Sequence, residues 1–168
     1  MVSDRPDRDH EEPQHVVTDA DAWRYAMIMW AADEASSGLG MKLEDVGVGW
    51  AKISMQVRPD MVNGWRICHG GLIAGLADSA FAVACNSRGT VTVASGFDID
   101  FLEPARLGDL LVAAATERVL RGRSGIYDVT VRRGSTVIAE FRGRSRSVNR
   151  TIEDRSTEQE ARPTTEEG

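Results

Sequence analysis

The chain has 168 residues, which is enough for one domain with a substantial hydrophobic core. Hydrophobic residues make up 42% of it and the formal net charge is −6, a profile typical of soluble proteins that argues against a general nucleic-acid binder. The N-terminal residues are charged and include prolines, with no apolar segment behind them, so we expect no signal peptide. We therefore expect a cytoplasmic protein in which Cys68 and Cys85, its only cysteines, stay reduced.

The two ends of the chain are rich in charged residues and poor in apolar ones. We predict mobile tails over residues 1–17 and 150–168, and one folded domain over residues 18–149. His10 and His15 lie in the first tail, where the neighbouring residues do not complete a metal site. We expect no metal in this protein.

A first helix is predicted to begin at Thr18, because Thr18 and Asp21 have the spacing of a capping box. Gly38 and Gly40 are expected to end it. The residues that recur at helical spacing on one face are Trp23, Met27, Trp30 and Glu34.

Residues 46–57 alternate between apolar and polar side chains, which predicts a half-buried strand. The residues expected on its apolar face are Ala51, Ile53, Met55 and Val57. The loop that follows, residues 58–68, contains Pro59, Asn63 and Gly64. It leads into the most apolar stretch of the chain.

Residues 72–85 carry small or apolar side chains on every face, and Asp78 is the only charged residue among them. A membrane helix needs about 20 apolar residues and excludes a mid-span carboxylate. The stretch therefore predicts the buried central helix of a soluble domain, without a membrane span. A buried carboxylate has partners, stays protonated or takes part in chemistry, because its burial otherwise costs several kcal/mol.

After Gly89, four segments have the pattern of strands: residues 91–101, 109–120, 125–132 and 136–148. Ser95 lies on the series of the first segment that is expected to face inward. One buried helix followed by strands without intervening helices predicts an antiparallel sheet that curls round the helix, an α+β architecture.

His69, Gly70 and Gly71 stand where the central helix begins. A helix start offers free N–H groups and a partial positive charge, and glycine leaves room for a ligand, although both glycines could instead serve tight packing. Asp78 follows Gly70 by eight positions, which is roughly 12 Å along a helix. If both act on one reacting group, a twofold dimer with antiparallel central helices and two shared sites is the simplest arrangement.

Several short motifs occur together in the order and spacing of the phenylacetic-acid-pathway thioesterases, so the chain resembles this family over about residues 19–148. These are hotdog-fold acyl-CoA thioesterases, in which an antiparallel sheet wraps round one long helix. The motifs are Asn63-Gly64, Cys68-His69-Gly70-Gly71, Leu76-Ala77-Asp78, Ala80-Phe81-Ala82, Ala84-Cys85-Asn86-Ser87, Phe101-Leu102-x-Pro104-Ala105, Gly108-Asp109 and Gly122-Arg123-x-Gly125-x-Tyr127-Asp128-Val129.

The resemblance implies hydrolysis of an acyl-CoA, with aryl-acetyl or other medium-sized acyl groups favoured. Asp78 would be the general base or the nucleophile, and the Gly70 N–H would polarise the thioester carbonyl, with no cofactor because coenzyme A belongs to the substrate. His69 would transfer a proton or position the thioester. A dimer at least is expected, and tetramers are common in the family.

The substrate-binding candidates are Asn63, Gly71, Ser95, Arg121 and Arg123. Arginines suit the phosphates of coenzyme A, and Arg142, Arg144 and Arg146 on the last strand are further candidates. Each of these arginines could equally belong to a solvated strand face, and Asn63 could simply shape its loop.

The chain departs from the family pattern in two places. Trp65-Arg66 follows Gly64 where relatives often have histidine, and Ala32 stands where some members have an active-site asparagine. The sequence therefore does not determine which acyl group the enzyme accepts. Two other classes also remain, an acyl-CoA hydratase and a non-catalytic acyl-CoA-binding module.

Overall fold

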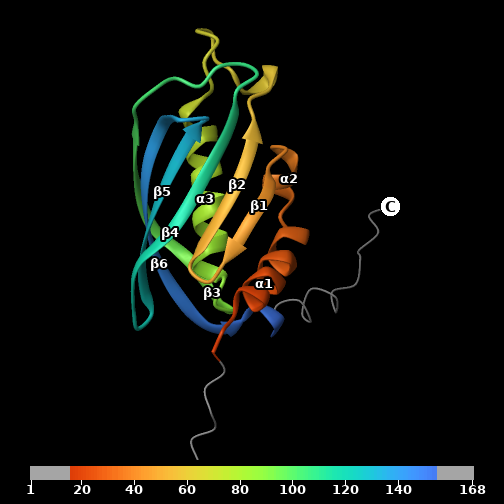
Figure 1. Cartoon of the computed structure of the whole chain (residues 1–168), viewed down its shortest axis with the longest axis vertical. Coiled ribbons are helices and arrows are strands. Elements are labelled where there is room, and N and C mark those ends of the chain that lie inside the picture. Colours follow the sequence, from red (N-terminus) through yellow and green to blue (C-terminus); the bar gives the residue numbers. More distant parts are fainter. Residues whose placement is uncertain (1–15, 155–168) are drawn as a thin grey trace, which may run out of the picture.

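The computed structural model describes residues 16–154. Helix α3 (Gly70–Asn86) lies against the inner side of a curved six-stranded sheet (Figure 1). The strands are β1 (Lys42–Gly47), β2 (Trp50–Gln56), β3 (Thr90–Phe101), β4 (Leu110–Arg121), β5 (Ser124–Arg133) and β6 (Thr136–Thr151). Their order in the sheet is β1-β2-β4-β5-β6-β3, and every neighbouring pair is antiparallel. The predicted α+β hotdog architecture is confirmed.

The core forms where α3 meets the inward side chains of the sheet. The predicted face of β2 is confirmed, because Ala51, Ile53 and Met55 are fully buried. The Phe81 ring of α3 lies 5.5 Å from the Tyr127 ring. Small residues on both layers let the helix approach closely, and each buried aromatic ring adds a large apolar area to the core.

The first helix is shorter than predicted and turns a different face inward. Helix α1 (Asp19–Ala31) begins with the predicted capping box, but Trp23 and Met27 are 37% and 53% exposed. Ala22, Tyr25 and Ala26 are the buried residues. Of the residues predicted to share one face, Trp30 packs against the core, whereas Trp23 and Met27 lie toward solvent.

A second short helix, α2 (Glu34–Gly38), replaces the predicted end of the first. Asp33 caps it, because its carboxylate accepts hydrogen bonds from the Ser36 N–H at 2.9 Å and from the Ser36 hydroxyl at 2.7 Å. A side chain that caps a new helix competes with continuation of the old one. The chain therefore breaks between Ala31 and Glu34.

The single strand predicted over residues 46–57 is the end of β1 and all of β2, joined by a tight turn. Gly49 at this turn has a φ of +81°, and its N–H donates to the Ser87 hydroxyl at 2.8 Å. In sequence the apolar positions change from Val46, Val48 and Trp50 to Ala51, Ile53 and Met55, and this shift of one residue is the signal of the turn that the single-strand prediction missed. Ser54 on the predicted polar face is also buried, since its hydroxyl donates to Glu44 of β1.

The register of β3 shifts between Ala94 and Gly96, which leaves Ser95 unpaired in a β-bulge. Beyond the bulge, Phe97 and Ile99 lie opposite the buried Gly143 and Phe141 and share their face. Ser95 itself is exposed, and its hydroxyl donates to the Arg144 carbonyl at 3.1 Å. The predicted inward series through Ser95 was wrong, because the extra residue exchanges the two faces of the strand.

Strand β3 pairs only with β6, so one of its edges has no partner among the described strands. Val93, Phe97 and Phe101 of this strand are 51%, 43% and 50% exposed. No helix within residues 16–154 is long and apolar enough to cross a membrane.

Ordered structure continues beyond the predicted domain boundary at residue 149. Strand β6 runs to Thr151, and residues 152–154 form one turn of helix. The rest of the two predicted tails, residues 1–15 and 155–168, lies outside the described residues.

Candidate active site

Asp78 lines a cavity of about 400 Å³ between α3, α1 and β3. Most of the residues that line it are apolar, among them Phe81 of α3, Ile28 of α1 and Val91 of β3, and polar atoms contribute almost half of its surface. A concave, mostly apolar space with few polar groups is typical of small-molecule sites. The central helix is thus buried on the sheet side and lines a cavity on another side.

The Asp78 carboxylate is half-buried and unpaired. Within residues 16–154 no group donates a hydrogen bond to it or forms an ion pair with it. Burial raises its pKa above the ordinary range, because the cavity wall replaces water around the charged form. Its oxygens are therefore available to a water molecule or a substrate.

Asp33 lines the same cavity but is already engaged, since Ser36 occupies both of its oxygens. The Ser36 hydroxyl also lies 2.9 Å from the Ser79 hydroxyl, which connects the start of α2 to the residue after Asp78. Ala32, at the position where some relatives have asparagine, also lines the cavity. The sequence did not single out Asp33 as a site residue; its cap spacing to Ser36 was the available signal.

Gly70 and Gly71 open α3 at the opposite end from Asn86. The first hydrogen bonds at this end run from the Leu72 and Ile73 N–H groups to the His69 carbonyl, at 2.9 and 3.3 Å. The N–H groups of Gly70 and Gly71 precede them and have no intrahelical acceptor. A side chain at Gly71 would meet nothing within 4 Å, so a ligand can approach this helix start.

The structure does not bring Asp78 and Gly70 together within one protomer. Both belong to the regular helix α3, and eight residues correspond to roughly 12 Å along its axis. A base and an oxyanion donor each have to lie about 3 Å from the atoms they act on. The two groups of one chain therefore lie too far apart to act on the same atom.

His69 and Asn63 lie before α3, outside the Asp78 cavity of the same protomer. His69 is exposed and its side chain does not cap the helix. The Asn63 side chain accepts hydrogen bonds from the N–H groups of Trp65 and Ile67 at 2.9 and 3.4 Å, so it shapes the loop. The Trp65 side chain is 85% exposed and lies on this loop.

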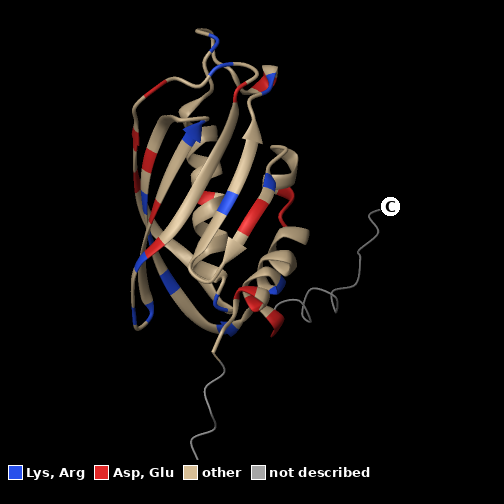
Figure 2. Cartoon of the chain, viewed as in Figure 1, with Lys and Arg blue, Asp and Glu red and all other residues tan. Residues whose placement is uncertain are grey.

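The candidate arginines differ in their hydrogen bonds and ion pairs to other residues. Arg142 holds Asp128 with two bonds of 2.7 and 2.9 Å, and Arg144 pairs with Asp98. Arg123 donates to the Ser147 carbonyl at 3.0 Å, whereas Arg121 pairs with no carboxylate within residues 16–154. Figure 2 shows acidic and basic residues interspersed over the strands in view, without a single basic patch.

Comparisons with known proteins show the family of this chain. The model of the thioesterase superfamily matches residues 66–140. The chain is 41% identical to the acyl-coenzyme A thioesterase PaaI of Escherichia coli K12 over 132 residues, which are 78% of this chain and 94% of that protein. The chain is a PaaI-type member of the thioesterase superfamily. Family membership makes it a thioester hydrolase.

Solved structures of related proteins share the fold of this thioesterase, among them two PaaI proteins. The E. coli PaaI protein from the phenylacetic acid degradation operon matches with a TM-score of 0.78 and 39% identity, over 79% of this chain and 97% of that chain. A mutant of the phenylacetic acid degradation protein PaaI from Thermus thermophilus matches with a TM-score of 0.67 and 34% identity, over 69% and 100%. The family recognised from the motifs is thus confirmed.

Proposed function

We propose that this thioesterase hydrolyses phenylacetyl-CoA, hydroxyphenylacetyl-CoA or another medium-sized acyl-CoA to the free acid and coenzyme A. The unpaired Asp78 carboxylate carries the proposal, because it lies beside a cavity of about 400 Å³ whose lining residues are mostly apolar. Such a cavity suits an aromatic or aliphatic acyl group, because both gain from removal of apolar surface from water. The relatives with a phenylacetic acid context support the aryl-acetyl group.

Asp78 would act by one of two routes. As a general base it takes a proton from water while the water oxygen adds to the thioester carbonyl carbon, and the C–S bond then breaks to release the thiolate. As a nucleophile it adds to the same carbon, displaces the thiolate and leaves a mixed anhydride that water hydrolyses. Both routes place negative charge on the carbonyl oxygen.

The Gly70 N–H of a second protomer would hold this oxyanion. A twofold dimer with antiparallel α3 helices places the start of one helix near the middle of the other, which creates two shared sites. The unpaired edge of β3 and its exposed Val93, Phe97 and Phe101 support an interface along this strand. The proposed functional unit is this dimer, which can assemble further into a tetramer.

The decisive experiment is a thiol-release assay with phenylacetyl-, hydroxybenzoyl-, short-chain and long-chain acyl-CoAs, for the wild type and Asp78→Asn. Both cysteines of the protein are buried thiols with raised pKa, so their background reaction is small. We expect release from aryl-acetyl or medium-sized substrates and its loss in the variant. Near-wild-type turnover by Asp78→Asn would refute the role of Asp78, and no turnover of any substrate by the wild type would refute the function.

Gly70→Pro tests the oxyanion donor because it removes this one N–H. Proline is favoured at the first position of a helix, and His69 has the extended ψ of 130° that a residue before proline requires. We expect kcat to fall by about 10²–10³-fold. Gly70→Ala is the matched control, since it keeps the N–H and adds a methyl 3.0 Å from the exposed Phe101 ring.

A mixture of the two inactive variants tests whether the site is shared. A dimer of one Asp78→Asn protomer and one Gly70→Pro protomer has one doubly damaged site and one intact site. Random exchange of protomers between the two variants makes half of the dimers mixed, and each mixed dimer has one of its two sites intact. The mixture should therefore regain about a quarter of wild-type activity. Light scattering on the same samples gives the assembly size, and a mixture as inactive as its parents despite exchange would exclude shared sites.

A further inference from the structure

The short segment after β6 contributes a side chain to the cavity that contains Asp78. Ile152 is 2% exposed and lines this cavity. Its N–H donates to the Gly89 carbonyl at 2.9 Å, and Gly89 lies just beyond the end of α3. Ile152 therefore lies at the end of the cavity near the C-terminus of α3.

The cavity follows one face of α3 from the carboxylate to this end. The α3 residues that line it, Asp78, Phe81, Ala82, Cys85 and Asn86, recur at helical spacing. The distance from Asp78 to Asn86 along the axis is roughly 12 Å. An extended chain advances about 3.5 Å for every three bonds, so this distance corresponds to about ten bonds.

Several interactions fix the position of Ile152. Thr151 pairs with Thr90 at the start of β3, and Thr151 and Asp154 exchange two hydrogen bonds of 3.2 Å around it. Glu153, on the other side, forms an ion pair with Arg24 of α1. The segment is thus attached to both elements that face each other across the cavity.

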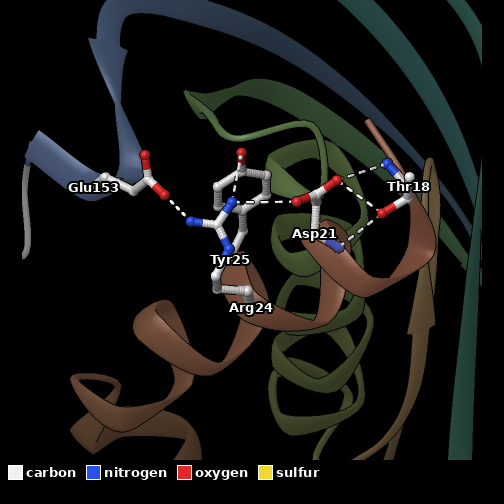
Figure 3. A network of polar contacts seen from close by, with 5 residues as sticks. All are labelled: Thr18, Asp21, Arg24, Tyr25 and Glu153. Atoms are coloured by element: carbon white, nitrogen blue, oxygen red, sulfur yellow. Dashed lines mark hydrogen bonds and ion pairs between the residues drawn. The ribbon is translucent and has the colours of Figure 1, made fainter. Parts of the chain in front are cut away.

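Arg24 is itself held in place on α1 (Figure 3). Its guanidinium donates to Asp21 at 3.2 Å and to the Tyr25 hydroxyl at 3.3 Å, and it lies 4.7 Å from the centre of the Tyr25 ring. The Tyr25 ring contacts Gly89, where an added methyl would lie 2.6 Å from a ring carbon. The same ring therefore supports the ion pair and the turn that binds Ile152.

We propose that Ile152 closes the acyl cavity and sets the longest acyl group that the enzyme accepts, with Arg24 and Glu153 as positioning residues. This inference rests on the proposed acyl-CoA hydrolysis. The substrates it favours are aryl-acetyl groups and aliphatic acyl groups of up to about ten carbons, because longer groups meet the Ile152 side chain. The selection acts on the end of the acyl group far from the thioester.

The test is the ratio of kcat/KM for dodecanoyl-CoA to that for octanoyl-CoA. Removing methylenes from a hydrophobic pocket changes such preferences by about 10-fold or more, so Ile152→Ala should raise the ratio by about tenfold. Ile152→Phe should lower it. Ile138→Ala is the matched control, because Ile138 is fully buried in β6 but does not line the cavity, so its ratio should equal that of the wild type.

The outcomes separate this inference from the function on which it rests. No hydrolysis by the wild type would refute the function, whereas wild-type hydrolysis with the same ratio in Ile152→Ala and Ile138→Ala would refute the role of Ile152. Glu153→Gln should shift the ratio of kcat/KM values in the same direction as Ile152→Ala, but by a smaller factor. An unchanged ratio would refute the positioning role of Glu153. If Ile152→Ala does not fold, Ile152→Val removes one methylene and gives the same test with a smaller expected shift.

Discussion

A single methyl group added at Gly143 should disturb the packing beside the Asp78 carboxylate. An ideal Cβ at this position lies 2.9 Å from three carbons of the Phe81 ring, where carbon atoms normally lie about 3.5–4.0 Å apart. The ring cannot move away freely, because the rings of Tyr127 and Phe141 lie 5.5 and 5.9 Å from it. Gly143→Ala should therefore displace Phe81.

The expected loss of stability follows from this overlap. Overpacking a core typically costs about 1–3 kcal/mol. Replacing glycine by alanine in a strand returns about 0.5–1 kcal/mol, because glycine loses more backbone entropy on folding. The net loss is about 1–2 kcal/mol, which lowers Tm by about 3–8 °C in a domain of this size. Because Phe81 follows Asp78 by one helical turn, kcat/KM should fall by about tenfold or more.

Thermal unfolding followed by circular dichroism, together with the thiol-release assay, checks both expectations. The control is Gly38→Ala, since a side chain at Gly38 meets nothing within 4 Å and the residue does not line the Asp78 cavity. This control should keep the activity of the wild type, and its Tm should be equal to that of the wild type or a few degrees higher, because alanine lowers the backbone entropy cost without a clash. A Gly143→Ala protein with unchanged Tm and unchanged activity would show that the rings of Phe81, Tyr127 and Phe141 can move at little cost in free energy. That result would refute the predicted overlap.

Three further results follow from the raised pKa values. The value of kcat/KM should fall in acid as Asp78 becomes protonated, and the midpoint of this fall should lie above the ordinary aspartate pKa of about 3.9. A midpoint at or below that value would contradict the burial of Asp78. Asp78→Asn should stabilise the protein by about 0.5–2 kcal/mol near pH 7, because the folded state disfavours the charged carboxylate. This gain in stability should disappear as the pH falls below the raised pKa of Asp78. An equal gain at all pH values, measured by denaturant titration, would exclude an electrostatic cause. Burial raises the pKa of Cys85 to about 12, so iodoacetamide at about pH 7.5 should not modify this thiol in the native protein. Mass spectrometry measures the modification, and a rate as high as in denaturant would contradict the burial of Cys85.

The sequence predicted the parts of the fold that depend on long, regular patterns. The apolar run around Asp78 became α3, and the four later segments became β3 to β6, because burial of a whole helix or a strand face leaves a periodic signal in sequence. The whole ordered set of motifs, from Asn63-Gly64 to Tyr127-Asp128-Val129, identified the family. These features involve many residues that all favour one structure.

The errors came from single residues that interrupt a pattern. The bulge at Ser95 exchanges the faces of β3, and the cap at Asp33 ends a helix whose periodicity continues. The cavity contacts of Ile152 depend on how the end of the chain packs against α1 and α3, so no local pattern contains them. Such features follow from tertiary contacts, and a single sequence does not specify their geometry.

The network around Arg24 brings together residues from both ends of the described chain. Thr18 precedes α1 and bonds to Asp21, while Glu153 follows β6, and both reach Arg24 through ion pairs or hydrogen bonds. Domains whose ends lie close together tolerate circular permutation. A short linker from residue 154 to residue 16, with a new opening at the exposed Gly122 turn, should preserve the described fold. In such a permuted protein a covalent link to α1 would follow Ile152 closely, so the cavity wall that Ile152 forms would depend less on the ion pair between Arg24 and Glu153.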